Sequence, residues 1–390
     1  MHLRWLQSAT GFASLAARED GMNDKGSEPI ARGETGGVSR RDFMKVCTAA
    51  AAAVGLPAWA GEKMAEGVAR GKKPSVVWLH FQECTGCTES LLRTSHPDVG
   101  DLILDLVSLD YHETLFAAAG RQIEDALEKA KRAGGYVLVV EGAIPMKDDG
   151  IYCMVGGKRA VDALVECAER AAAIICIGSC ASWGGVASAA PNPTEAVGAP
   201  RILAERKIAK PMVTLPGCPA NPYNLLGTVL QFATFGTLPK LDEKARPLFA
   251  YGRVIHEDCP RRPHFDAGRF AQAYGDAGHR EGFCLYKLGC KGPQTHANCS
   301  LLHFCEMPGA WPIGIGHPCV GCTEQGVGFH VPIHENLPID KLTAPMAYPG
   351  TREPQGTVGP IAAGVAGLAV GAIAGAGFIA SKKLSKEDEQ

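Results

Sequence analysis

Cysteines are the residues of this sequence whose number and spacing could do chemistry. The chain has 15 cysteines among 390 residues, more than packing alone requires. Two pairs have the CxxC spacing, Cys84 with Cys87 and Cys319 with Cys322. So many thiols fit three kinds of chemistry: disulfide bonds, zinc binding and iron–sulfur clusters. The number of cysteines does not by itself choose among the three.

The cysteines with the most informative positions form two groups along the chain. The first group supplies four thiols from three separate segments: Cys84, Cys87, Cys180 and Cys218. Four thiolates suit a cubane iron–sulfur cluster or a zinc ion. The second group comes from a region without periodicity and includes one histidine: His256, Cys259, Cys284, Cys290, Cys299, Cys319 and Cys322. These residues are enough for two more sites, but their spacing does not fix how they divide.

The first group is positioned by a predicted α/β domain over residues 74–245. Apolar runs have the pattern of buried parallel strands at Val76–Phe81, Leu102–Ser108, Tyr136–Val140, Ala173–Ile177 and Met212–Leu215. Helical patterns lie between or after them at Gln122–Arg132, Val161–Arg170 and Tyr223–Phe235. This order predicts a doubly wound, flavodoxin-like parallel sheet. Such sheets bind ligands beyond the carboxyl ends of their strands, which is where the four cysteines fall.

Two other ligands compete for the first group. A structural zinc ion favours compact CxxC pairs on a small scaffold rather than single cysteines on distant strand ends. The loop from Thr85 to Thr88 resembles the phosphate loop of flavodoxins, so flavin mononucleotide is an alternative, but thiolates would repel its phosphate. The second group lies in a predicted loop-rich iron–sulfur domain over residues 246–337. A region with so little regular structure needs cross-links, such as disulfide bonds or bound metals, to fold.

The first 60 residues are predicted to be a twin-arginine export signal, followed by a linker over residues 61–73. Arg40 and Arg41 stand in Ser-Arg-Arg-Asp-Phe-Met-Lys, and an Ala-rich apolar stretch follows. A small-x-small pattern places cleavage after Ala60, and Met22 would open a signal of more ordinary length. A short amphipathic helix is the alternative. The twin-arginine route carries folded proteins, so clusters can be inserted in the reducing cytoplasm, which weakens the disulfide interpretation.

The C-terminal part is predicted to anchor the chain in a membrane. Residues 361–380 contain no charge and, as a helix, would cross the hydrocarbon core of a bilayer. We therefore predict a linker over 338–357, a transmembrane helix over 358–381 and a cytoplasmic tail over 382–390. Lys382 and Lys383 favour a cytoplasmic C-terminus. The alternative is a flexible tail rich in Ala and Gly.

Composition and motifs argue against several other classes of protein. The formal net charge of −2 gives no support to nucleic-acid binding. The CxxCxxCxxxCP runs of bacterial ferredoxins, expected in the iron–sulfur subunit of an exported formate dehydrogenase, do not occur. A non-enzymatic exported binding protein stapled by disulfides remains as a rival, and the absence of visible absorption would identify it.

Five motifs together resemble the small subunits of nickel–iron hydrogenases, and most closely the membrane-bound hydrogenase-2 type. They are ECTGCTE from Glu83, VEGAIP from Val140, PGCP from Pro216, CLYKLGCKGP from Cys284 and GHPCVGC from Gly316. The resemblance covers nearly the whole chain, including the signal and the anchor. As a set these motifs are specific, whereas one CxxC would not be.

The resemblance implies a role for each candidate ligand. It assigns a proximal 4Fe–4S cluster to Cys84, Cys87, Cys180 and Cys218. It assigns a distal 4Fe–4S cluster to His256, Cys259, Cys284 and Cys290. It assigns a medial 3Fe–4S cluster to Cys299, Cys319 and Cys322. Pro312 lies near the expected position of a fourth medial ligand, and Cys305 could instead complete a four-iron medial cluster. Glu83 and Thr85 become candidates for a proton path.

The resemblance also implies how the chain works. Hydrogen would be split at a nickel–iron centre on a large subunit, because this chain has no motif for holding nickel. The clusters would relay electrons to a membrane acceptor, either a cytochrome b or a ferredoxin-like subunit with an integral membrane protein, at the periplasmic face of the inner membrane. Two heterodimers could pair. Oxygen-tolerant relatives have two additional proximal cysteines, and Gly86 and Gly185 stand at those positions here. We therefore expect ordinary oxygen sensitivity.

Overall fold

A parallel sheet of five strands forms the centre of the structure, a computed structural model that describes residues 48, 62–63, 73–95, 100, 107–304 and 307–345. The strands are β1 (Ser75–His80), β2 (Ser108–His112), β3 (Val137–Glu141), β6 (Ala173–Ile177) and β7 (Met212–Leu215). Their order is β2-β1-β3-β6-β7, and every neighbouring pair is parallel. This is the order of flavodoxin-like doubly wound sheets. The predicted α/β class with a parallel sheet is confirmed.

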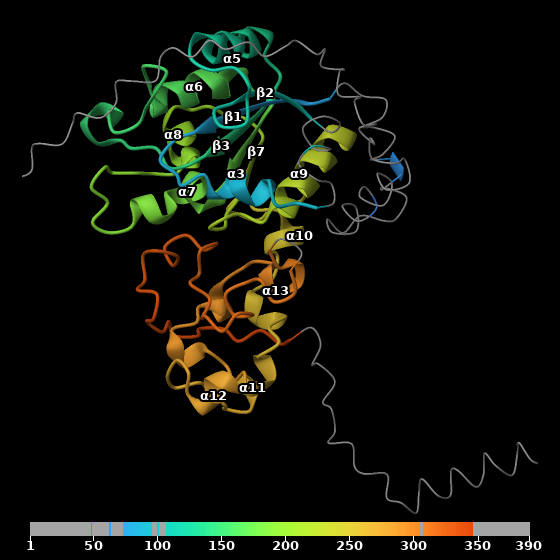
Figure 1. Cartoon of the computed structure of the whole chain (residues 1–390), viewed down its shortest axis with the longest axis vertical. Helices are drawn as coiled ribbons and strands as arrows, with labels where there is room; N and C mark the ends of the chain where they lie inside the picture. The colour runs from blue at the N-terminus through green and yellow to red at the C-terminus, as the bar shows by residue number, and fades with distance from the viewer. Residues whose placement is uncertain are drawn as a thin grey trace, which may run out of the picture.

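Helices cover both faces of this sheet (Figure 1). They are α3 (Gly86–Leu91), α5 (Arg121–Ala133), α6 (Ala160–Arg170), α8 (Ala199–Glu205) and α9 (Pro222–Phe235). Side chains alternate along each strand, so Trp78 and Val139 pack with α3 and α9, whereas Val77 and Leu138 pack with α5, α6 and α8. Each fully buried side chain of this size contributes roughly 1.5–3 kcal/mol, so both faces stabilise the sheet.

The second strand differs from the prediction. The structure pairs Ser108–His112 with β1, whereas the sequence placed this strand at residues 102–108; residues 101–106 lie outside the described part of the chain. Polar residues can occupy this partly buried edge strand because they have partners. The Ser75 hydroxyl donates to Asp110, and the ring of His112 contacts the Thr88 hydroxyl at 3.4 Å. An apolar pattern alone could not reveal such a strand.

Shorter elements complete the first domain. They are the hairpin of β4 (Met154–Val155) and β5 (Lys158–Arg159), the helix α7 (Gly178–Trp183), and the 3₁₀ turns η2 (Lys147–Gly150) and η3 (Gly185–Ser188). Of these, α7 follows β6 directly, so it lies at the carboxyl edge of the sheet. This edge is where the sequence predicted ligand binding.

The second domain is built from short turns around a small core (Figure 1). Its elements are α10 (Leu248–Tyr251), η4 (Ile255–Glu257), α11 (Arg262–Asp266), α12 (Ala277–Arg280), η5 (Tyr286–Leu288), η6 (Gly292–Gln294) and α13 (Cys299–Leu302). The buried core includes Cys259, Cys290 and Cys319 beside Trp311 and Ile313. Candidate ligands are therefore part of what holds this domain together.

A buried ion-pair network joins the two domains. Glu324 accepts from Arg246 at 2.7 Å, Lys244 at 2.9 Å and the ring of His296 at 2.8 Å. Although burial opposes ionisation, these donors lower the pKa of Glu324 to about 2. The carboxylate therefore stays charged at neutral pH and holds Lys244, at the end of the first domain, against the second domain.

The predicted membrane and export segments lie beyond this description. Residues 346–390, which include the predicted transmembrane helix, are outside the described residues, as is the predicted signal apart from Thr48. Among the described residues, no helix combines the length and apolar character needed to span a bilayer.

Candidate metal centres

The four cysteines of the first group surround one cavity at the carboxyl edge of the sheet. Cys84 follows β1, Cys87 begins α3, Cys180 lies in α7 after β6, and Cys218 follows β7. The structure therefore brings together thiols from residues that are up to 134 positions apart in the sequence, since Cys84 and Cys218 line the same space. Cys87 is buried, while Cys84 and Cys218 are exposed. Four sulfurs around one small cavity match the donor set of a cubane cluster.

Glycines leave room beside three of these sulfurs. A Cβ atom at Gly178 would lie 2.6 Å from the Cys87 sulfur, and one at Gly185 would lie 2.8 Å from the Cys180 sulfur. A Cβ atom at Gly86 would lie 3.0 Å from the Cys84 sulfur. Gly178 and Gly185 also have positive φ angles, which side chains disfavour. The cavity wall is thus shaped so that backbone, rather than side chains, approaches the sulfurs.

Glu141, at the end of β3, anchors the loop that carries Cys84 and Cys87. Its carboxylate is 2% exposed. It accepts from the backbone N–H of Cys87 at 3.0 Å and of Thr88 at 3.2 Å, from the Thr88 hydroxyl at 2.6 Å, and from the Trp78 indole at 3.1 Å. Sequence analysis gave Glu141 no role. The available signal was a carboxylate that ends an otherwise apolar strand, Val-Leu-Val-Val-Glu.

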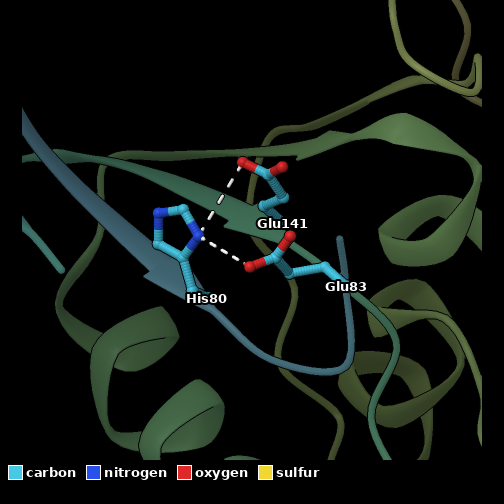
Figure 2. A group of neighbouring side chains, drawn as sticks. All are labelled: His80, Glu83 and Glu141. Atoms are coloured by element: carbon cyan, nitrogen blue, oxygen red, sulfur yellow. Dashed lines mark hydrogen bonds and ion pairs between the residues drawn. The ribbon is translucent and has the colours of Figure 1, made fainter. Parts of the chain in front are cut away.

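His80 connects Glu141 with Glu83 beside the same loop. Figure 2 shows the Nδ1 atom of His80 directed at both carboxylates, 3.3 Å from Glu83 Oε1 and 3.9 Å from Glu141 Oε2. The Thr85 hydroxyl also donates to Glu83 Oε1 at 3.2 Å. Burial and the nearby Glu141 carboxylate raise the pKa of Glu83. This cluster has the spacing of a metal site, but the oxygens of Glu141 already accept from four donors, so hydrogen bonding accounts for the arrangement.

The second cavity is lined by His256, Cys259, Cys284 and Cys290. His256 is 5% exposed, and its Nε2 atom has no hydrogen-bond partner. Burial, followed by the charge of Arg262, lowers the pKa of His256 to about 4, so the imidazole is neutral near pH 7. A buried neutral imidazole with an unpaired nitrogen is a suitable metal ligand beside three thiols.

The third cavity is lined by Cys299, Cys319 and Cys322, with Pro312 in its wall. Its volume is about 520 Å³, and Cys218 from the first domain also lines it. The cavity therefore lies at the junction of the domains, next to the first group of cysteines. Cys305 is outside the described residues.

Hydrogen bonds and shared lining residues connect the three sets of residues. The backbone N–H of Cys319 donates to the Cys290 sulfur at 3.4 Å, and Cys218 lines the third cavity together with Cys322. Ser179, which precedes Cys180, adds a bond from its hydroxyl to the Cys322 carbonyl at 2.5 Å. A ligand of the third cavity is thus hydrogen-bonded to a ligand of the second, and Ser179 connects it to the first. Sequence analysis missed Ser179 because its partner is 143 residues away.

The environment of the thiols favours metal ligands over nucleophiles or disulfides. Burial raises the pKa of Cys259, Cys299 and Cys322 to about 12, whereas a nucleophilic cysteine has a lowered pKa. Metal ions displace protons from such thiols and supply the missing positive charge. All thirteen described cysteines are free, so no disulfide occurs within the described residues. The disulfide-stapled alternative therefore does not hold for them.

Comparisons with known proteins place both domains among hydrogenase-related families. Residues 84–232 match the family of the 20 kDa subunit of NADH ubiquinone oxidoreductase, and residues 251–333 match the C-terminal family of NiFe/NiFeSe hydrogenase small subunits. The chain is 53% identical to the hydrogenase-2 small chain of Escherichia coli K12, over 91% of this chain and 95% of that one. It is 43% identical to the uptake hydrogenase small subunit of Azotobacter vinelandii, over 91% and 96%.

A solved structure shares the same fold. The reduced, active nickel–iron–selenium hydrogenase of Desulfomicrobium baculatum aligns with a TM-score of 0.61 and 32% identity, covering 65% of this chain and 95% of the other. The fold and the sulfur-lined cavities together define an electron-transfer subunit that carries iron–sulfur clusters. The chain belongs to the family of nickel–iron hydrogenase small subunits. It pairs with the large subunit of a hydrogenase, and the enzyme they form is an oxidoreductase that acts on hydrogen.

Proposed function

We propose that this chain relays electrons from the large-subunit active site through three clusters, held by the residues around the three cavities. The proximal 4Fe–4S cluster would be held by Cys84, Cys87, Cys180 and Cys218. The medial 3Fe–4S cluster would be held by Cys299, Cys319 and Cys322. The distal 4Fe–4S cluster would be held by His256, Cys259, Cys284 and Cys290. The supporting observation is that each set lines its own cavity, that Cys218 of the proximal set also lines the medial cavity, and that an N–H to sulfur hydrogen bond joins the medial and distal sets.

The residues of this chain would hold and tune the clusters, which supply one-electron redox chemistry. Glu141 fixes the Cys84–Cys87 loop through four hydrogen bonds, so two proximal ligands keep their geometry. Backbone N–H groups donate to the sulfurs, which raises the reduction potential of an iron–sulfur cluster. A neutral His256 in place of a thiolate removes negative charge from the distal site and has the same effect. Glu83, with its raised pKa and its bonds to Thr85 and His80, would hold a proton at the edge of the proximal site.

The proposal can be tested through the number of iron atoms in the medial cluster. Pro312 lines the medial cavity, so no side chain in its position can ligate a fourth iron. We expect oxidised wild-type complex to give the electron paramagnetic resonance signal of a three-iron cluster. Pro312→Cys should lose this signal and gain one iron, because a fourth thiol is supplied. Cys305→Ser is the matched control and should keep the signal. If instead the wild type lacks the signal and Cys305→Ser gains it, Cys305 is the fourth medial ligand.

We also propose that the large subunit covers the proximal edge. Cys84 and Cys218 are exposed, and large apolar side chains near this edge are exposed as well, including Val186 at 56% and Met154 at 51%. Val186 follows Gly185, where a Cβ atom would lie 2.8 Å from the Cys180 sulfur, so this apolar surface adjoins the proximal site. At the other end of the relay, the acceptor would be a cytochrome b or a ferredoxin-like subunit with an integral membrane protein. Two heterodimers could pair around it.

Export and anchoring complete the proposal. A twin-arginine signal over residues 1–60 would carry the folded complex to the periplasmic face of the inner membrane, and a helix over 358–381 would hold it there. We expect Arg40→Lys combined with Arg41→Lys to strand both this chain and its large subunit in the cytoplasm, measured by cell fractionation and immunoblotting. Lys45→Arg, which keeps the charge near the signal, is the control and should export normally. Normal export of the double variant would show that another signal carries the complex.

A further inference from the structure

Lys291 is a lysine buried between two candidate cluster sites. It is 0% exposed and follows directly after Cys290 of the distal set. Its backbone N–H donates to the carbonyl of Cys319 from the medial set at 2.8 Å. Its side chain runs along Gly321, where a Cβ atom would come within 3.2 Å of the Lys291 Cδ atom. Lys291 thus lies against a ligand loop of each site.

The ammonium group of Lys291 is surrounded by carbonyl oxygens. It donates to Pro332 at 2.9 Å, Ile333 at 3.0 Å, Glu335 at 3.3 Å and Gly289 at 3.3 Å. An ammonium has only donors, and each of these oxygens is an acceptor, so the surroundings match the charged form.

The carbonyls belong mainly to residues 332–338, which we call the strap. Gln294 donates to Pro338 in the strap at 2.5 Å, and the Tyr286 hydroxyl donates to Leu337 at 2.7 Å. Gly289 lets the strap approach, because a Cβ atom there would lie 2.4 Å from the carbonyl carbon of His334. Neutral groups therefore also hold the strap, and Lys291 adds to it a charge whose burial is unfavourable. Because burying a charge is unfavourable, the ammonium of Lys291 is expected to have a role other than holding the strap.

We propose, on the basis of the proposed relay, that Lys291 is a fixed positive charge that raises the reduction potentials of both the medial and the distal cluster. A reduced cluster carries one more negative charge than an oxidised one, so a nearby cation favours the reduced form. The effect is strong because the charge is buried and unscreened by salt. The proximal cluster lies on the other side of the domain junction and feels little of it. Lys291 thereby makes electron transfer from the proximal to the medial cluster more favourable.

The experiment is a potentiometric titration of the three clusters in the purified complex, followed by electron paramagnetic resonance. The wild-type signals test the proposed relay first, because their absence would refute it whatever Lys291 does. With the clusters present, Lys291→Met should lower the medial and distal midpoints, so that at the wild-type midpoint the ratio of reduced to oxidised medial cluster falls about tenfold. The proximal midpoint should stay near its wild-type value. Lys291→Arg keeps the charge and should stay near wild type at all three clusters.

A matched charge control comes from the same segment. Lys287 is exposed, so Lys287→Met removes an equal charge that solvent already screens and should barely move the midpoints. Gln294→Ala, which loosens the strap without removing a charge, should also leave them unchanged. Should Lys291→Met fail to load clusters, Lys291→Gln keeps donors for the strap and takes its place. The proposal is overturned if a loaded neutral variant has wild-type midpoints, if Gln294→Ala or Lys287→Met shifts them equally, or if only Lys291→Arg loads clusters, which would make Lys291 a folding residue.

Discussion

Cys218→Ser is expected to abolish hydrogen oxidation with an artificial electron acceptor, by on the order of 100-fold or more. Cys218 lines both the proximal and the medial cavity, so one residue adjoins two steps of the relay. Its loss would leave the large-subunit active site without an outlet for electrons. Exchange of hydrogen isotopes between gas and water needs no electron transfer away from the active site, so it should persist in the variant.

The comparison of these two activities makes the prediction specific. Cys153→Ser is the matched control, because Cys153 is a half-buried cysteine that lines none of the three cavities. This control should keep both activities. Loss of isotope exchange together with oxidation in Cys218→Ser would mean that the variant has lost its large subunit rather than its relay.

Oxygen is expected to stop hydrogen oxidation by the complex, which is the second large effect. Resemblance to oxygen-tolerant hydrogenases places their additional proximal cysteines at Gly86 and Gly185, and glycine offers no sulfur. The structure adds a steric reason, since a Cβ atom at Gly185 would lie 2.8 Å from the Cys180 sulfur and 2.7 Å from its backbone nitrogen. A proximal cluster with four cysteines would cycle through one redox step and could not deliver an additional electron to reduce oxygen at the active site.

A film of the purified complex on an electrode provides the measurement. The hydrogen-oxidation current should collapse when oxygen is admitted and should recover only after reduction. The same experiment without oxygen, under an equal flow of nitrogen, controls for loss of the film. A current sustained under air, or a second oxidation step of the proximal cluster, would contradict the prediction.

The sequence predicted the parts of the fold that depend on local patterns. Buried runs such as Ala173–Ile177 and Met212–Leu215 are strands with the predicted bounds, because a strand covered on both faces is apolar along its whole length. β2 was misplaced because its polar residues Asp110 and His112 depend on partners from β1 and α3. Local composition carries no information about such partners.

The same distinction between local and distant information applies to the residues of the candidate sites. Cysteines at strand ends were found because the topology of a doubly wound sheet brings those ends together. The division of the second group between two sites was left open by spacing and rested on family resemblance. Glu141, Ser179 and Lys291 were missed, since their partners are backbone groups and side chains 38 to 143 residues away. Only a three-dimensional structure shows that such residues support the ligands.

The folding of the second domain depends on whether its clusters have been inserted, so quality control in the cell can act on this step. Cys259, Cys290 and Cys319 are among its few buried residues, so a chain without clusters would bury unpaired thiols where a filled core should be. Such a chain would stay open and sensitive to proteases, because metal binding and folding are one cooperative event in domains of this kind. A cell could thus distinguish loaded from empty subunits by compactness alone, and no dedicated sensor of the clusters would be needed.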